Sequence, residues 1–193
     1  PRAAGTSLAG QVVGSGIVVD VSRNFNQILE INTEDGWVMV EPGVIRDDLN
    51  HQLKPTGLFF GPETSTASRA MIGGMIGNNS CGLHSLRWGT TRDQLLGVEA
   101  VLSTGELVWI DEEGIHGSSV EWVQDVFQLV HENAELIAER SPKSTVTRRN
   151  TGYALDALLD NRQSSIVPLI AGSEGTLVFI TKAKLRLRPL PPP

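Results

Sequence analysis

The sequence is poor in cysteine, in aromatic residues and in long apolar runs, and each shortage narrows what the protein can be. Its 193 residues include one cysteine, so no disulfide forms within the chain and a reducing, cytoplasmic compartment is expected. No apolar stretch reaches the roughly 18–20 residues that a membrane-spanning helix needs. The 16 basic residues are outnumbered by 22 acidic ones, which disfavours nucleic acid as a partner.

What the chain does have is the composition of one globular domain. Apolar residues make up 40% and charged residues 20%, and the length is enough to bury a sizeable core. The last residues are Pro189, Leu190 and three further prolines, which favours an extended linker. We therefore expect residues 1–193 to be a single domain taken from a longer protein.

The hydrophobic pattern predicts strands and hairpins with a few interspersed helices. The expected strands span residues 17–21, 27–32, 36–41, 95–103, 106–110, 166–171 and 176–187, with hairpin turns near 33–36 and 104–105. One expected helix spans residues 44–53. A longer one, from a cap at Ser118 and Ser119 to about Glu139, carries an apolar stripe of Val120, Val123, Phe127, Val130, Ala134 and Ile137. This order indicates an α+β domain and not a doubly wound one.

Three segments consist mainly of small and polar residues: 1–10, 61–82 and 171–177. Small residues let backbone N–H groups approach an anion, so the first segment suits a phosphate, although it is neither a G-x-G-x-x-G motif nor a P-loop. The second segment has hydroxyls, amides and bare backbone over more than twenty residues, which is typical of a chain wrapped around a large polar ligand. The third, taken alone, is consistent with a simple turn between two strands.

Together, in this order, the segments resemble the FAD-binding domain of the vanillyl-alcohol oxidase/p-cresol methylhydroxylase superfamily. Within it they resemble FAD-linked oxidases of the D-lactate dehydrogenase, glycolate oxidase flavoprotein and D-2-hydroxyglutarate dehydrogenase type. The resemblance covers nearly the whole chain, and its landmarks are Ala4-Gly5-Thr6-Ser7, Ile72-Gly73-Gly74 to Cys81-Gly82, Arg87-Trp88-Gly89 leading to Leu96-Gly97-Val98-Glu99, and Gly172 to Leu177. It implies a mixed or antiparallel sheet flanked by helices. The family's N-terminal strand-helix-strand unit and its C-terminal substrate domain would both be absent here.

The resemblance implies FAD as the cofactor and assigns its contacts. The pyrophosphate would be held by Pro1, Arg2, Ala3, Ala4, Gly5, Thr6 and Ser7. The pyrophosphate, ribityl chain and flavin ring would be lined by Ser65, Thr66, Ala67, Ser68, Arg69, Ala70, Met71, Asn78, Asn79, Ser80 and Cys81. The adenine half would contact Glu174, Gly175, Thr176, Leu177, Val178, Phe179 and Ile180. Thr6 stands about where relatives with covalent flavin carry a histidine, so the FAD would be non-covalent. Cys81 replaces a small residue of the family near the flavin.

The implied activity is oxidation of a D-2-hydroxy acid to a 2-oxo acid, with hydride transfer to flavin and a separate electron acceptor. The groups that bind substrate would lie on the absent domain, so no catalytic residue is assigned. The isolated chain is expected to be inactive, to hold FAD weakly and to self-associate through its uncovered surfaces. Two alternatives stay open: a sugar-directed oxidase or reductase of the same superfamily, and a non-catalytic module that binds a nucleotide or a partner protein.

No metal site is predicted from the sequence. No two of His51, His84, His116 and His131 have the i, i+4 spacing of a helical metal site, and one cysteine supplies no thiolate cluster. Surface positions are expected for the histidines, and only His84 follows the presumed flavin segment closely. The four tryptophans are expected to pack in the core or against a partner.

Overall fold

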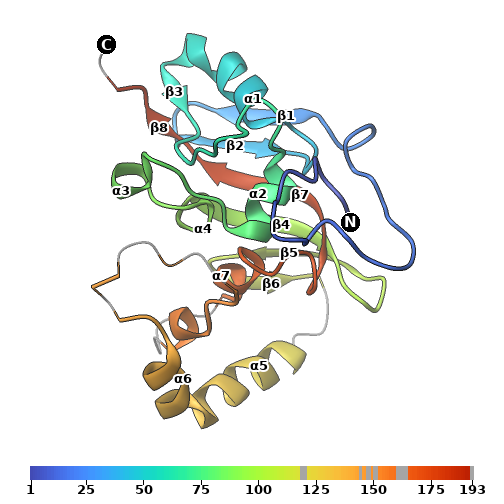
Figure 1. Cartoon of the computed structure of the whole chain (residues 1–193), viewed down its shortest axis with the longest axis vertical. Helices are drawn as coiled ribbons and strands as arrows, with labels where there is room; N and C mark the ends of the chain where they lie inside the picture. The colour runs from blue at the N-terminus through green and yellow to red at the C-terminus, as the bar shows by residue number, and fades with distance from the viewer. Residues whose placement is uncertain (118–120, 144, 147–148, 150–151, 160–164, 192–193) are drawn as a thin grey trace.

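A computed structural model of the chain describes residues 1–117, 121–143, 145–146, 149, 152–159 and 165–191 (Figure 1). Its centre is a six-stranded antiparallel sheet with the strand order β1-β2-β7-β4-β5-β6, and a second small sheet pairs β3 with β8. The strands are β1 (Ile28–Asn32), β2 (Trp37–Val40), β3 (Leu58–Phe59), β4 (Leu95–Val101), β5 (Leu107–Asp111), β6 (Gly114–His116), β7 (Phe179–Arg186) and β8 (Arg188–Pro189). The late strand β7 therefore lies between two earlier hairpins and joins them into one sheet.

Helices pack on one face of this sheet and beyond its β6 edge (Figure 1). They are α1 (Arg46–Leu53), α2 (Ile72–Asn78), α3 (Ser85–Trp88), α4 (Thr91–Gln94), α5 (Glu121–Glu132), α6 (Ala134–Arg140) and α7 (Val167–Ile170), with 3-10 turns at Lys54–Thr56 and Leu155–Leu158. Alternate strand residues such as Val98 and Ala183 are fully buried and share a core with Leu49 of α1, Ile76 of α2 and Ile170 of α7. Of the described helices, all are too short or too polar to cross a membrane.

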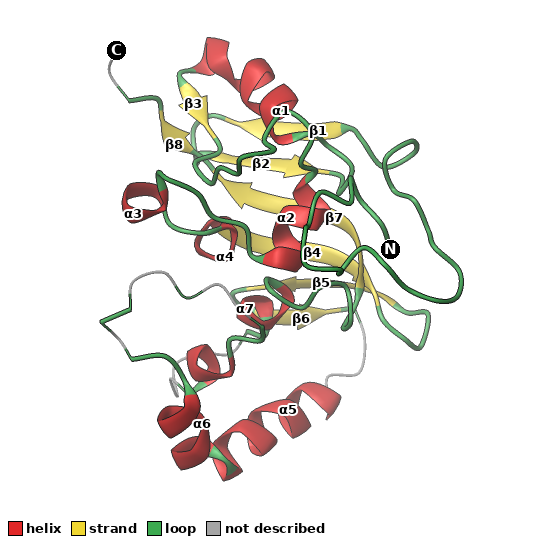
Figure 2. Cartoon of the chain, in the orientation of Figure 1, coloured by secondary structure: helices red, strands yellow, loops and turns green. Residues whose placement is uncertain are grey.

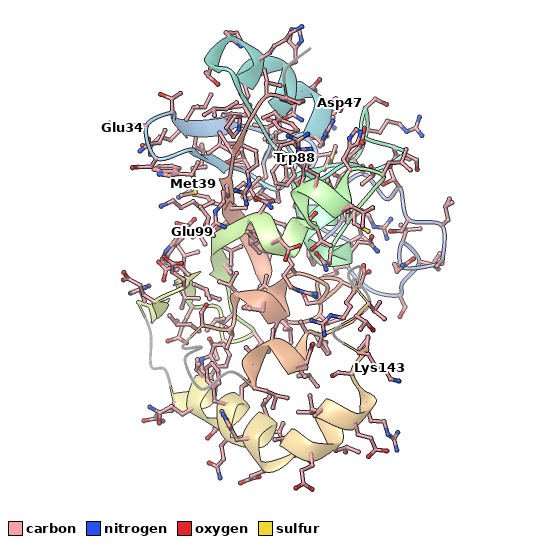
Figure 3. All side chains as sticks on the ribbon, turned by 90° about the vertical axis from the view of Figure 1, so that its left-hand side faces the viewer. Glu34, Met39, Asp47, Trp88, Glu99 and Lys143 are labelled. Atoms are coloured by element: carbon pink, nitrogen blue, oxygen red, sulfur yellow. The ribbon has the colours of Figure 1, made fainter. Side chains whose placement is uncertain are left out.

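On the other face of the sheet lie the side chains of the strand residues that alternate with the buried ones. Met39 of β2 and Glu99 of β4 are half-buried there, and Figure 3 shows both on the same side of the molecule. Lys182 of β7 pairs with Glu99, and Lys184 stacks over the ring of Trp37 at 4.3 Å from its centroid. This face therefore combines the long stems of charged residues with apolar side chains.

The predicted fold class is confirmed, and so are its local elements where a turn signal defines them. Both hairpins are present, β1 with β2 and β4 with β5, each antiparallel. The first turn ends at Gly36, whose φ of +68° is a conformation that glycine adopts without strain. The helix expected over residues 44–53 is α1, which buries Leu49 and Leu53.

The strand expected over residues 17–21 is wrong. Only a single bridge forms, in which Arg2 N–H donates to the Val19 carbonyl at 2.8 Å and Val21 N–H donates to the Arg2 carbonyl at 3.0 Å. Ile17 remains 96% exposed. These apolar residues belong to the long loop before β1 (Figure 2), where no neighbouring strand of the described chain pairs with them to form a sheet.

The strand expected over residues 166–171 is a helix, α7. Pro168 lies in its first turn, where the missing N–H costs nothing, and the Ser165 hydroxyl accepts a hydrogen bond from Val167 N–H at 3.1 Å. The apolar run is buried as predicted, but as a helix packed on β4. A short apolar run does not by itself distinguish a buried helix from a buried strand.

Two further elements differ from the prediction in length. The long helix is interrupted at Asn133, whose side-chain amide donates back to the Leu129 carbonyl at 2.8 Å, so α5 and α6 are separate. Val123 and Val130 are buried as expected, and the other described stripe residues are half-buried. The predicted cap at Ser118 and Ser119, and Val120 of the stripe, lie outside the described residues. Strand β7 begins only at Phe179, because Thr176 closes a turn on the Ser173 carbonyl with both its N–H and its hydroxyl.

Candidate functional site

The three small-residue segments meet at one cavity of about 510 Å³. It lies between the N-terminal loop, helix α2 and the turn that leads to β7, which are close together in Figure 1. The lining residues are Pro1 to Ala9, Gln11, Val12, Val21, Pro42, Thr64 to Thr66, Ala70, Met71, Gly73 to Met75, Gly77, Asn78, Ser80, Cys81, Ser173 to Gly175, Val178 and Ile180. Gly5, Ser65 and Gly175, one from each segment, all line this cavity.

The second and third segments are bonded to each other at the end of α2. Gly172 N–H donates to the Ile76 carbonyl and Glu174 N–H donates to the Gly77 carbonyl, both at 2.9 Å. These carbonyls are at the C-terminal end of the helix, where the last C=O groups lack partners one turn further along the helix. A Cβ on Gly77 would lie 3.6 Å from Glu174 Cα, which is van der Waals contact, so the turn lies directly on the helix.

The N-terminal loop covers the same two elements. A Cβ on Gly74 of α2 would stand 3.4 Å from Ala3 Cβ, and a Cβ on Gly175 would stand 3.4 Å from Pro1 Cγ. The loop turns back at Gly5, which has a φ of +63°. The Arg2 guanidinium donates to the Val12 carbonyl, so the side chain ties the two limbs of its own loop together. One wall of the cavity is therefore a closed loop that packs against Gly74 and Gly175.

Another wall of the cavity is formed by the stretch of chain before α2. Ala70 N–H donates to the Thr66 carbonyl at 2.7 Å, the Thr64 and Thr66 hydroxyls lie 3.2 Å apart, and Gly73 N–H donates to the Pro42 carbonyl at 2.7 Å. Arg46 N–H of α1 donates to the Ala70 carbonyl at 2.9 Å. These bonds fix a turn whose hydroxyls border the cavity.

The lining has little charge and many polar groups. Arg2 and Glu174 are the only charged residues among the described lining residues. Hydroxyls come from Thr6, Ser7, Thr64, Ser65, Thr66, Ser80 and Ser173, and amides from Gln11 and Asn78. An anionic ligand would therefore be held mainly by hydroxyls and backbone N–H groups, not by a cluster of cations.

Comparison with known proteins decides the family. The sequence pattern of the family described as "FAD binding domain" matches residues 1–111. The chain belongs to this FAD-binding family. D-2-hydroxyglutarate dehydrogenase of Pantoea ananatis is 43% identical over 99% of this chain, and that of Escherichia coli is 41% identical over the same share. The chain spans about one fifth of the length of each, 20%.

More distant relatives share the same region. The probable mitochondrial D-lactate dehydrogenase of Danio rerio is 31% identical over 99% of the chain, which covers 30% of that protein. A solved structure of alkyldihydroxyacetonephosphate synthase superposes on the whole chain with a TM-score of 0.65 at 18% identity, and 27% of that structure is covered. This second likeness shows that the fold is shared.

The cavity of this FAD-binding domain fits the group that its family binds. Glycines 74, 77 and 175 present bare backbone to the cavity, and the hydroxyls and amides match a ligand with two phosphates and a sugar alcohol chain. Apolar Val12, Met71, Met75, Val178 and Ile180 share the lining, which suits the ring systems. FAD supplies a hydride acceptor where it binds.

Most residues predicted to contact FAD lie on this cavity, and the contacts themselves stay predictions. All of residues 1–7 line it, with Ser65, Thr66, Ala70, Met71, Asn78, Ser80, Cys81, Glu174, Gly175, Val178 and Ile180. The predicted residues that do not line it are Ala67, Ser68, Arg69, Asn79, Thr176, Leu177 and Phe179. Asn79 is fully buried behind the wall, whereas Ser68, Arg69, Thr176 and Leu177 are exposed away from the cavity.

The sequence prediction missed the glycine face of α2. Gly73, Gly74 and Gly77 line the cavity on helix α2, and the helices expected from the sequence do not include this segment. The signal was present in the spacing of the apolar residues Ile72, Met75 and Ile76, all of which are buried. The remaining missed residues, Leu8, Ala9, Gln11, Val12, Val21, Pro42, Thr64, Met75 and Ser173, flank predicted ones or reach the cavity by folding.

The singled-out histidines lie elsewhere. All four are exposed, and His84 Nδ1 lies 2.8 Å from Glu63 Oε2 without lining the cavity. Asp111, Glu113 and His116 place possible metal-ligand atoms within 4.8 Å of one another, an arrangement common among exposed acidic groups that bind no ion. Trp88 packs edge-on against Phe59, with ring centroids 5.2 Å apart, as expected for a packing role.

Proposed function

We propose that this FAD-binding domain belongs to an enzyme that oxidises a D-2-hydroxy acid to a 2-oxo acid with FAD as hydride acceptor. One observation carries the proposal: three segments far apart in sequence line a single cavity suited to FAD, in a chain 43% identical to a D-2-hydroxyglutarate dehydrogenase. This relative and the D-lactate dehydrogenase act on 2-hydroxy acids, as their names state. D-2-hydroxyglutarate is the first substrate to test.

In this proposal the domain binds and orients the cofactor. The loop of residues 1–7 would face the pyrophosphate, the wall from Ser65 to Cys81 the ribityl chain and flavin, and the Glu174–Ile180 stretch the adenine half. The FAD would be non-covalent, because no histidine is among the described lining residues and Thr6 cannot form the histidine link. The catalytic base and the cations that hold the substrate carboxylate are not assigned to this chain.

The proposal extends to partners and location. Reduced FAD must pass its electrons to an acceptor, which we expect to be a separate molecule or protein. Self-association is supported by the exposed apolar loop residues Leu8, Val13 and Ile17 and by the edge strands β1 and β6. The single cysteine supports a cytoplasmic location.

The experiment is reduction of the full-length protein that carries this sequence. The purified protein should show flavin absorption bands, which bleach on anaerobic addition of D-2-hydroxyglutarate or D-lactate. A dye acceptor should then allow turnover. Bleaching by sugars alone would favour the sugar-directed alternative, and a protein without bound flavin that gains none on titration would favour a non-catalytic module.

A further inference from the structure

Arg92 lies behind the FAD cavity and contacts both of the walls that meet at α2. It is in the short helix α4, which is next to α7 in Figure 1. Its backbone N–H donates to Asn79 Oδ1 at 2.8 Å, at the end of α2. Its Nε lies 2.9 Å from the Pro168 carbonyl and 3.1 Å from the Ala171 carbonyl, just before the turn at residues 172–175.

All the hydrogen bonds that the guanidinium donates in the described part of the chain go to backbone carbonyls. Besides Pro168 and Ala171, it donates to the carbonyls of Arg149 and Gly152, each at 3.3 Å. None of the ion pairs found among the described residues includes Arg92. Burial lowers the pKa of Arg92 from its ordinary value, the expected effect of a cation held without an ion-pair partner. Only arginine has a planar fork of five donors that can bond several carbonyls at once.

Gly172 and Asn79 lie close to Arg92 and adopt backbone conformations with a positive φ. A Cβ on Gly172 would stand 2.7 Å from Arg92 Nη2 and 2.5 Å from the Gly152 carbonyl oxygen, and Gly172 has a φ of +100°. Asn79 is fully buried with a φ of +48°, and its Nδ2 has no hydrogen-bond partner in the part of the chain described. The Oδ1 of Asn79 is thus oriented by the N–H of Arg92.

We propose that Arg92 is a positioning residue for the FAD site. It holds residues 168–171 in place, so that Gly172 and Glu174 can donate to the carbonyls at the end of α2 and both walls keep the spacing that FAD requires. Arg92 itself does not line the cavity. The inference rests on the proposed FAD-dependent function and names the residue that shapes its site from behind.

The test compares FAD affinity in variants of the full-length protein. FAD is removed, and its dissociation constant is measured by fluorescence quenching for the wild type, Arg92→Ala and Arg92→Lys. We expect Arg92→Ala to raise the dissociation constant at least about tenfold, which corresponds to the loss of one charge-assisted hydrogen bond. Arg92→Lys should recover little, because an ammonium group has no planar fork.

Two controls separate positioning from a general loss of stability. Arg188→Ala removes a half-buried arginine that bonds Gln94 Oε1 at 3.2 Å and does not line the cavity, so FAD affinity should be unchanged. Millimolar guanidinium ion should restore FAD affinity to Arg92→Ala, and methylammonium should not. Should Arg92→Ala not fold, Arg92→Lys is measured in its place, and its FAD dissociation rate should rise while its melting temperature without FAD stays near that of wild type.

Each outcome decides the matter. Equal FAD affinity in wild type and the Arg92 variants overturns the inference and leaves the proposed function standing. Weaker binding that guanidinium ion does not reverse, with a matching fall in melting temperature, shows a purely structural role and also overturns it. A wild-type protein that binds no FAD overturns the proposed function together with the inference.

Discussion

The side-chain amide of Asn78 donates to Glu174 Oε1 at 3.0 Å, across 96 positions of sequence. Both residues line the cavity, one at the end of α2 and the other in the turn before β7. Backbone bonds from Gly172 and Glu174 to the same helix end run beside this contact. The two walls of the cavity are therefore joined by hydrogen bonds, and the contribution of each residue can be tested separately.

Two substitutions of Glu174, by alanine and by glycine, should show that its backbone conformation is strained. Its φ of +52° lies in the left-handed region, which disfavours residues with a Cβ. Glu174→Ala and Glu174→Gly both lose the bond from Asn78, so their difference isolates the backbone. We expect the Gly variant to be more stable to urea by about 0.5–1 kcal/mol, the strain relieved less the added entropy of the unfolded chain. An Ala variant as stable as the Gly variant would contradict the left-handed conformation.

Gly74 should be required for the cofactor and not for the fold. Its position in α2 is exposed toward the cavity, and an added Cβ would meet only Ala3 Cβ, at 3.4 Å. Gly74→Val should therefore leave the melting temperature near wild type, because valine is a better helix former than glycine, yet weaken FAD binding by filling the space under the loop. Gly74→Ala is the matched control and should bind FAD more tightly than the Val variant. Equal FAD affinity in all three proteins would place the ligand elsewhere.

Cys81 is half-buried and lines the cavity near the expected position of the flavin. A bulky ring at this position would compete with the flavin for space, so Cys81→Phe should lower FAD affinity in the full-length protein. Cys81→Ser, of nearly equal size, should keep it. Flavin titration followed by fluorescence gives both values, and full affinity in the Phe variant would show that Cys81 lies away from the flavin.

Acid should weaken the fold in part through Glu99. Burial alone would raise the pKa of this carboxyl, but hydrogen bonds from Lys182 at 2.9 Å and Thr181 at 2.8 Å outweigh it, and the pKa is lowered from 4.5. Because the folded pKa is below the unfolded one, the stabilisation is complete above the unfolded value and is lost as the pH falls through the folded value.

Replacing that carboxyl should flatten the acid dependence. Between about pH 5 and pH 3 the free energy of unfolding of Glu99→Gln, measured in urea, should fall less steeply than that of wild type. The difference should stay below about 1 kcal/mol, since the ion pair is partly exposed. Glu34→Gln, at an exposed turn, controls for the loss of one negative charge. A wild-type slope in Glu99→Gln would contradict the assigned role.

Secondary structure was predicted correctly from the sequence where local signals determine it, and wrongly where contacts with distant residues determine it. The turn residues at 33–36 and 104–105 define their hairpins by themselves, and both are present. Residues 17–21 have strand composition but no partner strand in the part of the chain described. Residues 166–171 instead include helix α7, whose first turn accommodates Pro168 and whose Val167 N–H donates to the Ser165 hydroxyl. Propensity yields to tertiary context in both cases.

For the candidate site, too, local features were predictable from the sequence and long-range contacts were not. The small-residue segments could be read from composition and from the family resemblance, and they do line one cavity. The position of Asn79 behind the wall could not, nor could the contacts of Arg92 with carbonyls 57 to 79 residues away. Such contacts depend on where chain segments meet in space, which has no periodic signature in the sequence.

The central claim is that FAD binds in the cavity between the three segments. Hydrogen exchange of the full-length protein, followed by mass spectrometry with and without FAD, tests it most directly. We predict slower amide exchange on FAD addition in residues 2–12, 64–81 and 173–180, and no change in the α5–α6 region at residues 121–140. FAD binding that leaves those three segments unprotected, or that protects residues 121–140 in their place, would contradict the account.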